Sequence, residues 1–502
     1  MTNSLTPVCS RYFICSLLVA AAQATPSANW PQFRGSNSQG VADAEKPPVE
    51  FGPNKALLWK TRLPPGVSSP CIWGDRIFVT AFDQEGKKLE TICLDRKTGT
   101  IVWRKAAPPH EIEKVHEVSS PANTSPATDG HRVFVHFPAC GLVAYSFDGK
   151  VAWSKPLPAA RVDFGSGASP AIVGGMLLLR VPVEKEPHML AVRCEDGATV
   201  WKAFDERFRD GWASPVAWTE RGRPVVGVRS FGQFNVLDAQ TGTNVWWLSG
   251  IPMSSCTTPA VSDAVVFLTG TGVFGNKENV LKPPDFDGLL AKYDANKDGR
   301  LGTDELPDSL LFVNRGTSSG AGSHSLSELL RGGPNPNHKS YDKAEWIKAT
   351  GELYQDFITG DFMRTAAFAV RTGGQGDATN RLVWSEPKGV PEVPSPLLYR
   401  DRVYYIKNGG IFTCRDPQTG KSLYDERVGA EGGYFASPVA ADGRVYVASD
   451  RGVITVLRAG DEFSVLSRAE LKETIMATPA IVDDKLYVRS AGHLWAFGHE
   501  RP

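Results

Sequence analysis

Eight Ser-Pro or Thr-Pro steps recur along the chain, and each is followed directly by an apolar stretch. The steps begin at Ser69, Ser125, Ser169, Ser214, Thr258, Ser395, Ser437 and Thr478. Successive steps lie 56, 44, 45, 44, 137, 42 and 41 residues apart. A fixed period of about 40–45 residues built from short strands is typical of a β-propeller, in which each repeat forms one blade. The repeat therefore predicts a propeller scaffold, and such a scaffold constrains function only loosely.

Each repeat has the pattern of a short antiparallel meander after its proline. In the seventh repeat the apolar runs Arg444–Ala448 and Val453–Leu457 flank an Asp-Arg-Gly turn. Alternating β-branched and aromatic residues between such turns favour half-buried strands. Several repeats end in an Asp-x-x-Thr-Gly or Asp-Gly turn followed by a tryptophan, as at Trp103, Trp153 and Trp246. The glycine supplies the positive φ of the turn, and we expect each indole to pack between neighbouring blades.

The two ends of the chain complement each other. The last repeat runs from Thr478 to Phe497 without a fourth strand, whereas residues 56–60 form an isolated strand that carries Trp59. Pairing these two segments would remove the free edges of an open sheet. We therefore expect an all-β, eight-bladed propeller closed by its N-terminal and C-terminal strands. Seven blades is the alternative.

The repeats resemble the pyrroloquinoline quinone (PQQ)-like repeats of the quinoprotein alcohol dehydrogenase-like superfamily. Residues 94–99 and 237–242 match the Leu-Asp and Thr-Gly core of that repeat, and residues 29–35 (Asn-Trp-Pro-Gln-Phe-Arg-Gly) resemble the start of secreted bacterial members. The similarity covers about residues 29–275 and 365–498. The resemblance implies the propeller fold and leaves two classes of function open.

One class is a secreted binding or scaffold propeller, similar to the propeller lipoprotein of the outer-membrane assembly machinery. The other is a PQQ-dependent dehydrogenase, which the resemblance implies would hold the quinone over a metal in the central funnel beside a catalytic Asp. Many such enzymes also carry a disulfide between adjacent cysteines, and this chain has no adjacent cysteine pair. We therefore expect a scaffold that binds an unidentified protein or small-molecule ligand at the propeller face. The dehydrogenase, whose catalytic and quinone-binding residues the sequence does not identify, is the alternative.

The first 24 residues have the features of a secretory signal peptide. Arg11 precedes the apolar run Tyr12–Ala22, which ends in the small-residue pattern Ala22-Gln23-Ala24. The run is short for a membrane span, so we expect no stable span after cleavage. An uncleaved anchor is the alternative. In both cases the propeller would lie in the periplasm or be secreted.

Composition argues against a polyanionic partner and against a disulfide framework. The chain has 55 basic and 55 acidic residues, so nucleic-acid binding is not expected. Six cysteines follow the signal segment without a C-x-x-C motif. Cys93, Cys194 and Cys414 occupy comparable positions before turns, which indicates buried apolar packing.

The 137-residue interval between Thr258 and Ser395 exceeds one repeat by about 90 residues, which predicts an insertion in the fifth blade. We expect the insertion to span residues 280–362. The chain would then divide into a signal peptide (1–24), a first propeller part (25–279), the insertion, and a second propeller part (363–502).

Residues 294–305 match a complete EF-hand calcium loop. The ligands predicted by the loop positions are side-chain oxygens of Asp294, Asn296 and Asp298, the backbone carbonyl of Arg300, and both carboxylate oxygens of Glu305. Gly299 permits the sharp turn, and Pro307 is expected to shorten or kink the exit helix. We expect one bound calcium ion, with either a structural or a regulatory role. An Asp/Gly-rich turn without metal is the alternative.

EF-hands usually pair, and the predicted partner ends at Tyr341 and Glu345. Its earlier ligand positions hold Pro334, Pro336 and His338, so we expect a degenerate hand that pairs without binding calcium. A second polar cluster lies between the first two blades and contains His110, Glu111, Glu113, His116 and Glu117. We interpret this cluster as a solvated loop, with a metal or ligand site as the alternative.

Overall fold

The computed structural model of the chain describes residues 29–499, apart from 109–111, 114, 117–118, 160–163, 184, 210–211, 253–255, 272–279, 314–323, 333–338, 360–364 and 388–389. The signal segment therefore lies outside the described residues, as do His110, Glu111 and Glu117. Eight antiparallel sheets form the body of the molecule, and each corresponds to one blade. The predicted eight blades are confirmed.

The first four blades follow one another along the chain. Blade 1 contains β2 (Cys71–Trp73), β3 (Arg76–Asp83), β4 (Lys88–Asp95) and β5 (Ile101–Ala106), and blade 2 contains β6 (Ala127–Thr128), β7 (Arg132–Phe137), β8 (Gly141–Ser146) and β9 (Val151–Lys155). Blade 3 contains β10 (Ala171–Val173), β11 (Met176–Val181), β12 (His188–Arg193) and β13 (Thr199–Phe204). Blade 4 contains β14 (Val216–Glu220), β15 (Arg223–Ser230), β16 (Gln233–Asp238) and β17 (Asn244–Ser249), and the short β25 (Gly376–Asp377) adds to its outer edge in parallel.

The remaining four blades complete the ring. Blade 5 contains β18 (Ala260–Val261), β19 (Val265–Gly270), β24 (Ala366–Arg371) and β26 (Leu382–Glu386), and blade 6 contains β27 (Leu397–Tyr399), β28 (Arg402–Lys407), β29 (Ile411–Arg415) and β30 (Ser422–Arg427). Blade 7 contains β31 (Val439–Ala441), β32 (Arg444–Ala448), β33 (Val453–Arg458) and β34 (Val465–Glu470). Blade 8 contains β35 (Ala480–Val482), β36 (Lys485–Arg489) and β37 (His493–Phe497), and its fourth strand is β1 (Leu57–Arg62).

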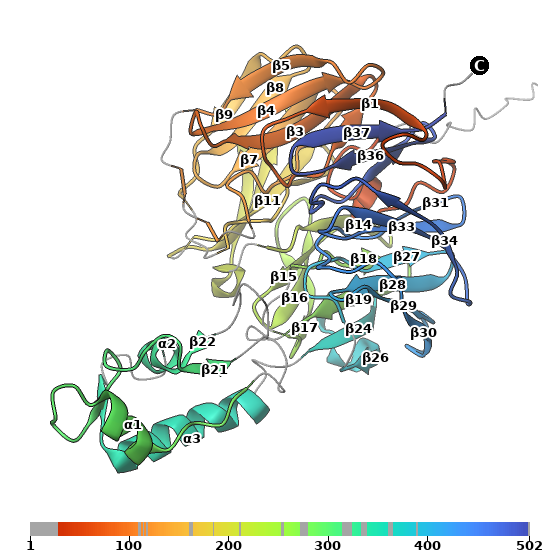
Figure 1. Cartoon of the computed structure of the whole chain (residues 1–502). Helices are drawn as coiled ribbons and strands as arrows, with labels where there is room; N and C mark the ends of the chain where they lie inside the picture. The colour runs from red at the N-terminus through yellow and green to blue at the C-terminus, as the bar shows by residue number, and fades with distance from the viewer. Residues whose placement is uncertain are drawn as a thin grey trace, which may run out of the picture.

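Blade 8 joins the two ends of the chain. β1 pairs antiparallel with β37, with Lys60 opposite Trp495, and the two strands lie side by side in Figure 1. Glu473 reinforces the junction, since its carboxylate accepts from Ser490 Oγ at 2.7 Å and lies 3.2 Å from Lys60 Nζ and 2.7 Å from His493 Nδ1. Burial raises the pKa of Glu473, but hydrogen bonds from Ser490, His493 and Lys60 outweigh it and bring that pKa to about 2. The junction therefore carries a charged network as well as backbone pairing.

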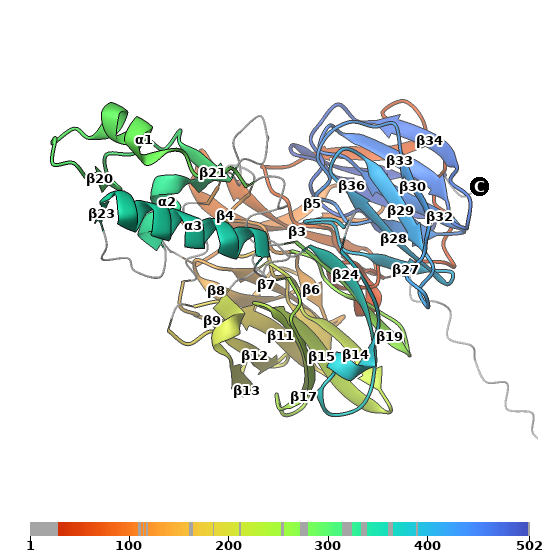
Figure 2. The same ribbon diagram turned by 90° about the horizontal axis from the view of Figure 1, so that it is seen from below.

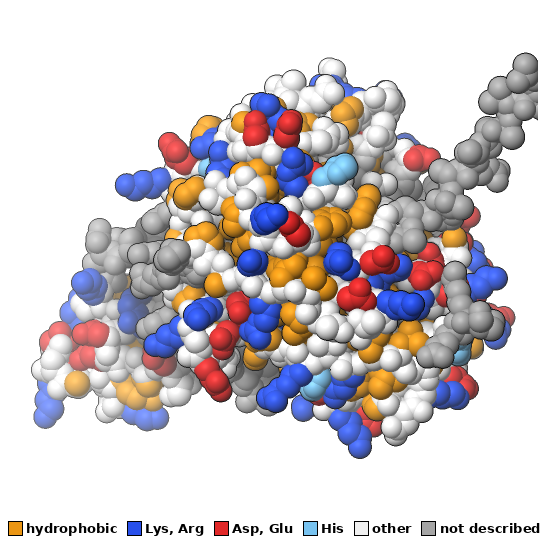
Figure 3. Space-filling model, turned by 90° about the horizontal axis from the view of Figure 1, so that it is seen from above, with side chains coloured by type: hydrophobic (Ala, Val, Ile, Leu, Met, Phe, Trp, Pro, Cys, Tyr) orange, Lys and Arg blue, Asp and Glu red, His pale blue; other side chains and the backbone are white. Residues whose placement is uncertain are grey.

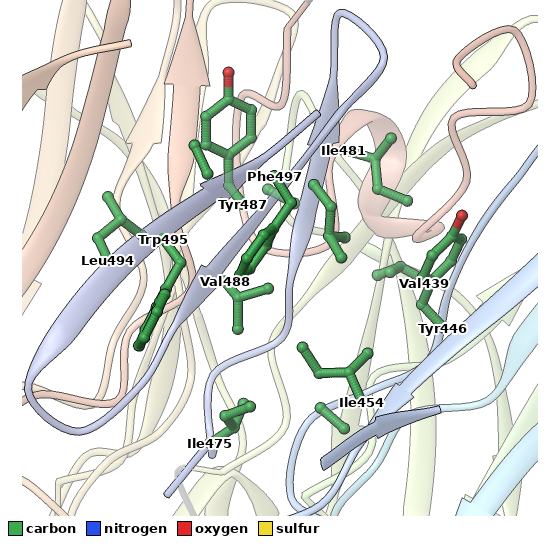
Figure 4. Packing of buried hydrophobic residues seen from close by; sticks show 14 of the residues in the cluster. Val439, Tyr446, Ile454, Ile475, Ile481, Tyr487, Val488, Leu494, Trp495 and Phe497 are labelled. Carbon is green, nitrogen blue, oxygen red and sulfur yellow. The ribbon is translucent and has the colours of Figure 1, made fainter. Parts of the chain in front are cut away.

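The core lies between adjacent sheets. In Figure 4, Trp495 and Phe497 on β37 and Tyr487 and Val488 on β36 pack in the same cluster as Tyr446 from the neighbouring blade 7. Trp495 and Phe497 stack with ring centroids 6.0 Å apart. Similar clusters fill the other blade interfaces, so each blade buries apolar side chains on both of its faces.

The hydroxyl groups of the Ser-Pro and Thr-Pro steps form a hydrogen-bonded ring around the centre. In each bond the backbone N–H of one step donates to the side-chain hydroxyl of the step in the next blade. Seven such bonds, each 2.9 or 3.0 Å long, join Ser69 to Ser125, Ser125 to Ser169, Ser169 to Ser214, Thr258 to Ser395, Ser395 to Ser437, Ser437 to Thr478 and Thr478 to Ser69. The Thr258 hydroxyl, by contrast, has no partner among the described residues.

Tryptophans on the outer strands connect each blade to the next. The indole of Trp153 in blade 2 lies against Gly197 in blade 3, where an added Cβ would come within 2.7 Å of the ring. Its Nε1 donates to the carbonyl of Cys194 at 2.9 Å. The same arrangement recurs for Trp59, Trp103, Trp201 and Trp384, which lie against Gly99, Gly149, Gly242 and Gly420. The expected packing of these indoles between blades is confirmed.

Trp246 in blade 4 departs from this pattern. Its Nε1 donates to Glu220 in its own blade at 3.1 Å, and the guanidinium of Arg381 lies over the indole at 4.7 Å. Arg381 belongs to the segment that leads into β26 of blade 5. A cation–π contact therefore takes the place of the turn glycine at this interface.

The segment that precedes β1 lies across the centre of the ring. Its contacts reach the innermost strand or a residue beside that strand in seven blades: Trp30 with Ile72, Pro31 with Thr128, Gln32 with Ile172, Gln39 with Val261, Arg34 with Pro396, Ala42 with Ala440, and Lys46 with Asp484 in the turn after β35. Arg34 is fully buried, and burial lowers the pKa of its guanidinium to about 9. The segment is therefore bonded to the inner side of most blades of the ring. We name residues 30–46 the plug.

The insertion leaves blade 5 between β19 and β24 and forms a small body of its own. It contains α1 (Phe286–Tyr293), β20 (Leu301–Gly302), β21 (Leu311–Val313), β22 (His324–Ser325), α2 (Leu326–Gly332), β23 (Ser340–Tyr341) and α3 (Lys343–Thr359). Figures 1 and 2 show α1, α2 and α3 projecting to one side of the blades. Phe286, Leu301, Val313, Leu326 and Trp346 pack in a separate apolar cluster. The insertion therefore has its own core.

The surface agrees with the balanced composition. On the face shown in Figure 3, basic and acidic side chains are interspersed. No helix among the described residues is long and apolar enough to cross a membrane. Cys93, Cys194 and Cys414 are buried free thiols, as expected, and burial raises the pKa of Cys93 and Cys194 to about 12.

Candidate functional site

Helix α1 positions the predicted calcium loop. Asp285 caps the helix by accepting the backbone N–H of Gly288 at 2.9 Å, and Phe286 and Leu289 face the core of the insertion. The helix ends where the N–H of Asp294 donates to the carbonyl of Leu290 at 3.1 Å. The first predicted ligand therefore stands directly after a helix that is fixed by its cap and its apolar face.

The polar side chains of residues 294–305 bind the backbone of their own loop. Asp294 Oδ2 accepts the N–H of Gly299 at 3.0 Å, and Asn296 Oδ1 accepts the N–H of Asp298 at 2.8 Å. Glu305 Oε1 accepts the N–H of Ala295 at 3.1 Å, and its Oε2 accepts the N–H of Gly302 at 2.7 Å. Glu305 therefore reaches back across the loop toward its first residues.

Gly299 has a φ of 76°, which is the conformation expected at the sharp turn. Among the described residues, no group of three or more His, Cys, Asp or Glu side chains lies close enough together to hold a metal ion. In the loop itself the carboxylates accept N–H groups instead. Part of the predicted ligand set, Asn296 and the carbonyl of Arg300, consists of neutral oxygens.

The expected exit helix is absent. After Glu305 the chain turns at Leu306 and Pro307 and continues into the short strand β21. Proline lacks a backbone N–H and cannot sit in a helix interior, which accounts for this path. The loop is thus entered by a helix and left by a strand.

The predicted partner hand does lie beside the loop. β20 pairs antiparallel with β23, with Leu301 opposite Tyr341. The Arg300 side chain extends the contact, since it donates to the carbonyl of Ser340 at 3.0 Å and forms an ion pair with Glu345. Glu345 also accepts the N–H of Asp342 at 2.9 Å. Pro334, Pro336 and His338 lie outside the described residues.

The polar cluster between blades 1 and 2, interpreted from sequence as a solvated loop with a metal or ligand site as the alternative, contributes residues to a cavity. Glu113 and His116 line this cavity, which has a volume of about 920 Å³. The opposite wall includes Arg489 at the end of β36, and Gly66 lies next to it. In the sequence Arg489 ends the apolar run Leu486–Val488, but that position alone does not indicate a cavity.

Comparison with solved structures identifies proteins of similar fold. The chain is an eight-bladed propeller of PQQ-like repeats, and its solved neighbours share this architecture at low sequence identity. BamB from Moraxella catarrhalis is 16% identical and covers 89% of this chain and 98% of its own, with a TM-score of 0.52. A europium-containing methanol dehydrogenase is 10% identical and covers 94% of this chain and 98% of its own, with a TM-score of 0.53. The computationally designed Ika8 protein is 11% identical and covers 87% and 98%, with a TM-score of 0.50.

The family is identified by sequence. Residues 51–181, 186–302 and 358–500 match the PQQ_2 family, which is described as outer membrane protein assembly factor BamB. The chain belongs to this family. No curated protein matches the chain.

Proposed function

We propose that the chain is an extracytoplasmic binding or scaffold propeller that carries one calcium ion in residues 294–305. Membership of the BamB family supports the scaffold, and the partner would be a protein bound at a face of the propeller. The apolar run before Ala24 supports export through a cleaved signal peptide. The domain limits at residues 24, 279 and 362 are part of the same proposal.

The path of Glu305 supports the calcium site. Its carboxylate spans the loop between Ala295 and Gly302, so the twelfth position already faces the first turn. Asp294, Asn296 and Asp298 offer side-chain oxygens on that turn, and Arg300 offers its carbonyl. These residues are oxygen donors of the kind that Ca²⁺ prefers. Bound calcium would replace the N–H partners of these groups and tie α1 to β20.

A PQQ-dependent dehydrogenase remains the second candidate because one structural neighbour is a methanol dehydrogenase. That likeness lies far below 25% identity and shows the fold alone. No residue of the described chain has been assigned to quinone chemistry. The scaffold is therefore the function that the family supports better.

Isothermal titration of the metal-stripped full chain with calcium tests the proposal. We expect one ion per chain, with a dissociation constant between about micromolar and millimolar. Glu305→Gln should abolish the binding heat because it removes a charge and one anionic ligand oxygen. Glu352→Gln, on the exposed face of α3, is the matched control and should bind calcium like the parent chain.

The same sample is then titrated with PQQ in the presence of calcium. No heat with PQQ agrees with the scaffold, whereas stoichiometric PQQ binding would favour the dehydrogenase. Absence of calcium binding in the parent chain would contradict the calcium site and leave the scaffold to be judged by the PQQ result.

A further inference from the structure

The cavity between blades 8 and 1 has the size and lining of a small-molecule site. Its volume of about 920 Å³ falls within the range of roughly 300–1,000 Å³ that is typical of ligand pockets. Apolar side chains contribute much of the wall, including Val67, Phe82, Val115 and Met476. The segments that meet here come from both ends of the chain, and blade 8 holds them together.

A buried cation without an anionic partner lies in this wall. Arg489 is only 1% exposed, and its Nη2 donates to the carbonyl of Pro64 at 3.0 Å. Its Nε and Nη1 have no hydrogen-bond partner among the described residues, and no described carboxylate forms an ion pair with it. A buried charge that lacks a counter-charge is costly, and burial lowers the pKa of this guanidinium to about 10. Arg489 is thus still charged at neutral pH.

Two other blades carry an arginine near the same end of the second strand, and both use it structurally. Arg180 donates to the carbonyls of Phe208 and Arg229 at 3.4 and 2.6 Å. Arg229 donates to the carbonyls of Thr269 and Pro252 at 3.0 and 2.8 Å. Arg489 makes one such bond and lines a cavity. The space beside it depends on Gly66, where an added Cβ would lie 2.7 Å from Nη2.

The other charged groups at the cavity do not neutralise Arg489. Lys87 adds a second positive charge from an exposed position on the rim. Glu113 is the acidic residue among the described residues of the lining, and burial raises the pKa of its carboxyl to about 7. His116 packs against Phe164 in a tilted arrangement, with ring centroids 4.9 Å apart. The lining residues that the structure describes therefore carry a net positive charge at and below neutral pH.

We infer that this cavity binds a small organic acid, whose carboxylate pairs with Arg489 while its apolar body contacts Val67, Phe82 and Met476. A carboxylate supplies the missing counter-charge and accepts the free N–H groups of the guanidinium. The apolar wall favours a ligand that has an apolar part, which an inorganic anion lacks. This site is separate from the calcium loop and does not depend on it.

Matched pairs of acids and neutral amides test the inference. The purified full chain is titrated with phenylacetate, phenylacetamide, hexanoate and hexanamide, and binding is followed by ligand-observed NMR and calorimetry. We expect each acid to bind roughly 10- to 100-fold more tightly than its amide, because charge-assisted hydrogen bonds contribute about 1.5–3 kcal/mol. Arg489→Gln should remove this preference.

A second variant tests the site even if Arg489→Gln fails to fold. Ala491→Trp places a large side chain at an exposed position of the same wall and leaves Arg489 unchanged, so it should abolish binding of the acids. Ala152→Trp, at an exposed position on β9, should bind like the parent chain. Equal binding of acids and amides, or binding of neither, would overturn the inference. Inorganic phosphate that binds as tightly as the acids would overturn the assignment to organic acids.

Discussion

At the scale of single residues, the Ser-Pro and Thr-Pro steps owe their recurrence to the hydroxyl ring. Proline favours an extended conformation in the residue before it, and in that conformation the N–H of seven of the eight Ser or Thr residues reaches the hydroxyl in the next blade. A buried N–H that loses its acceptor carries the full cost of desolvation. The hydroxyl therefore has a structural function in seven positions and lacks one at Thr258.

This difference predicts opposite results for two isosteric substitutions. Thr478→Val removes the acceptor of the Ser437 N–H and should lower the free energy of unfolding by about 1–3 kcal/mol. Thr258→Val removes a buried hydroxyl that has no described partner and should change stability by less than about 0.5 kcal/mol or raise it. Thermal and urea unfolding of both variants would check this. Equal destabilisation would contradict a structural role of the ring.

A buried histidine predicts how stability varies with pH. His136 on β7 is 3% exposed, and burial lowers the pKa of its imidazole from 6.5 to about 4. The unfolded chain then binds more protons than the folded chain between these two values. The neutral His136 therefore makes its full contribution to the free energy of unfolding above pH 6.5. This contribution is lost as the pH decreases toward 4, by at most roughly 3 kcal/mol.

His136→Leu should make the midpoint of urea denaturation depend less on pH over this interval. His131→Leu, at an exposed position of the same blade, is the control and should keep the parental slope. An unchanged slope in His136→Leu would exclude this imidazole as its source.

At the scale of elements, the outer strand of one blade is attached to the turn of the next by its tryptophan. The Trp153 indole packs against Gly197 and donates a hydrogen bond to the carbonyl of Cys194. It thereby joins β9 to the turn after β12. The glycine is required twice, because its φ of 72° is left-handed and because any Cβ would overlap the indole. The tryptophan of one repeat and the turn glycine of the next repeat therefore act together at each such interface.

Trp153→Ala should lower the free energy of unfolding by about 2–4 kcal/mol through lost packing and the unpaired carbonyl of Cys194. Trp153→Phe keeps a ring against Gly197 and should cost about half as much. Val151→Ala, 60% exposed on the same strand, should have little effect. Calorimetric unfolding would rank the three, and equal losses for Ala and Phe would contradict the packing contribution.

Local patterns also determined which sites could be predicted at this scale. The calcium loop stays a prediction, which the sequence permits because the candidate ligand positions lie within twelve consecutive residues. Pro307 predicted a disturbed exit helix but not its complete absence, because proline is compatible both with a kinked helix and with a strand. The cavity around Arg489 could not be predicted, because Gly66 and Met476 approach it from opposite ends of the chain.

At the scale of the whole molecule, periodicity made the fold accessible from sequence. Eight equivalent steps predicted eight blades, since each repeat must bury both faces against its neighbours. The plug was not predicted. Its motif was recognised as a family resemblance, but the bonds from Gln32 and Gln39 to strands in blades 3 and 5 depend on the closed ring.

The pairing of β1 with β37 has a consequence for biosynthesis. β1 leaves the ribosome well before β37, because seven of the eight blades lie between them in the sequence. Closing so long a loop is entropically slow, and until it closes the edges of β1 and β37 are open to other chains. The ring can therefore close only once β37 has been synthesised, and the interval before closure is when these free strand edges most need protection from aggregation.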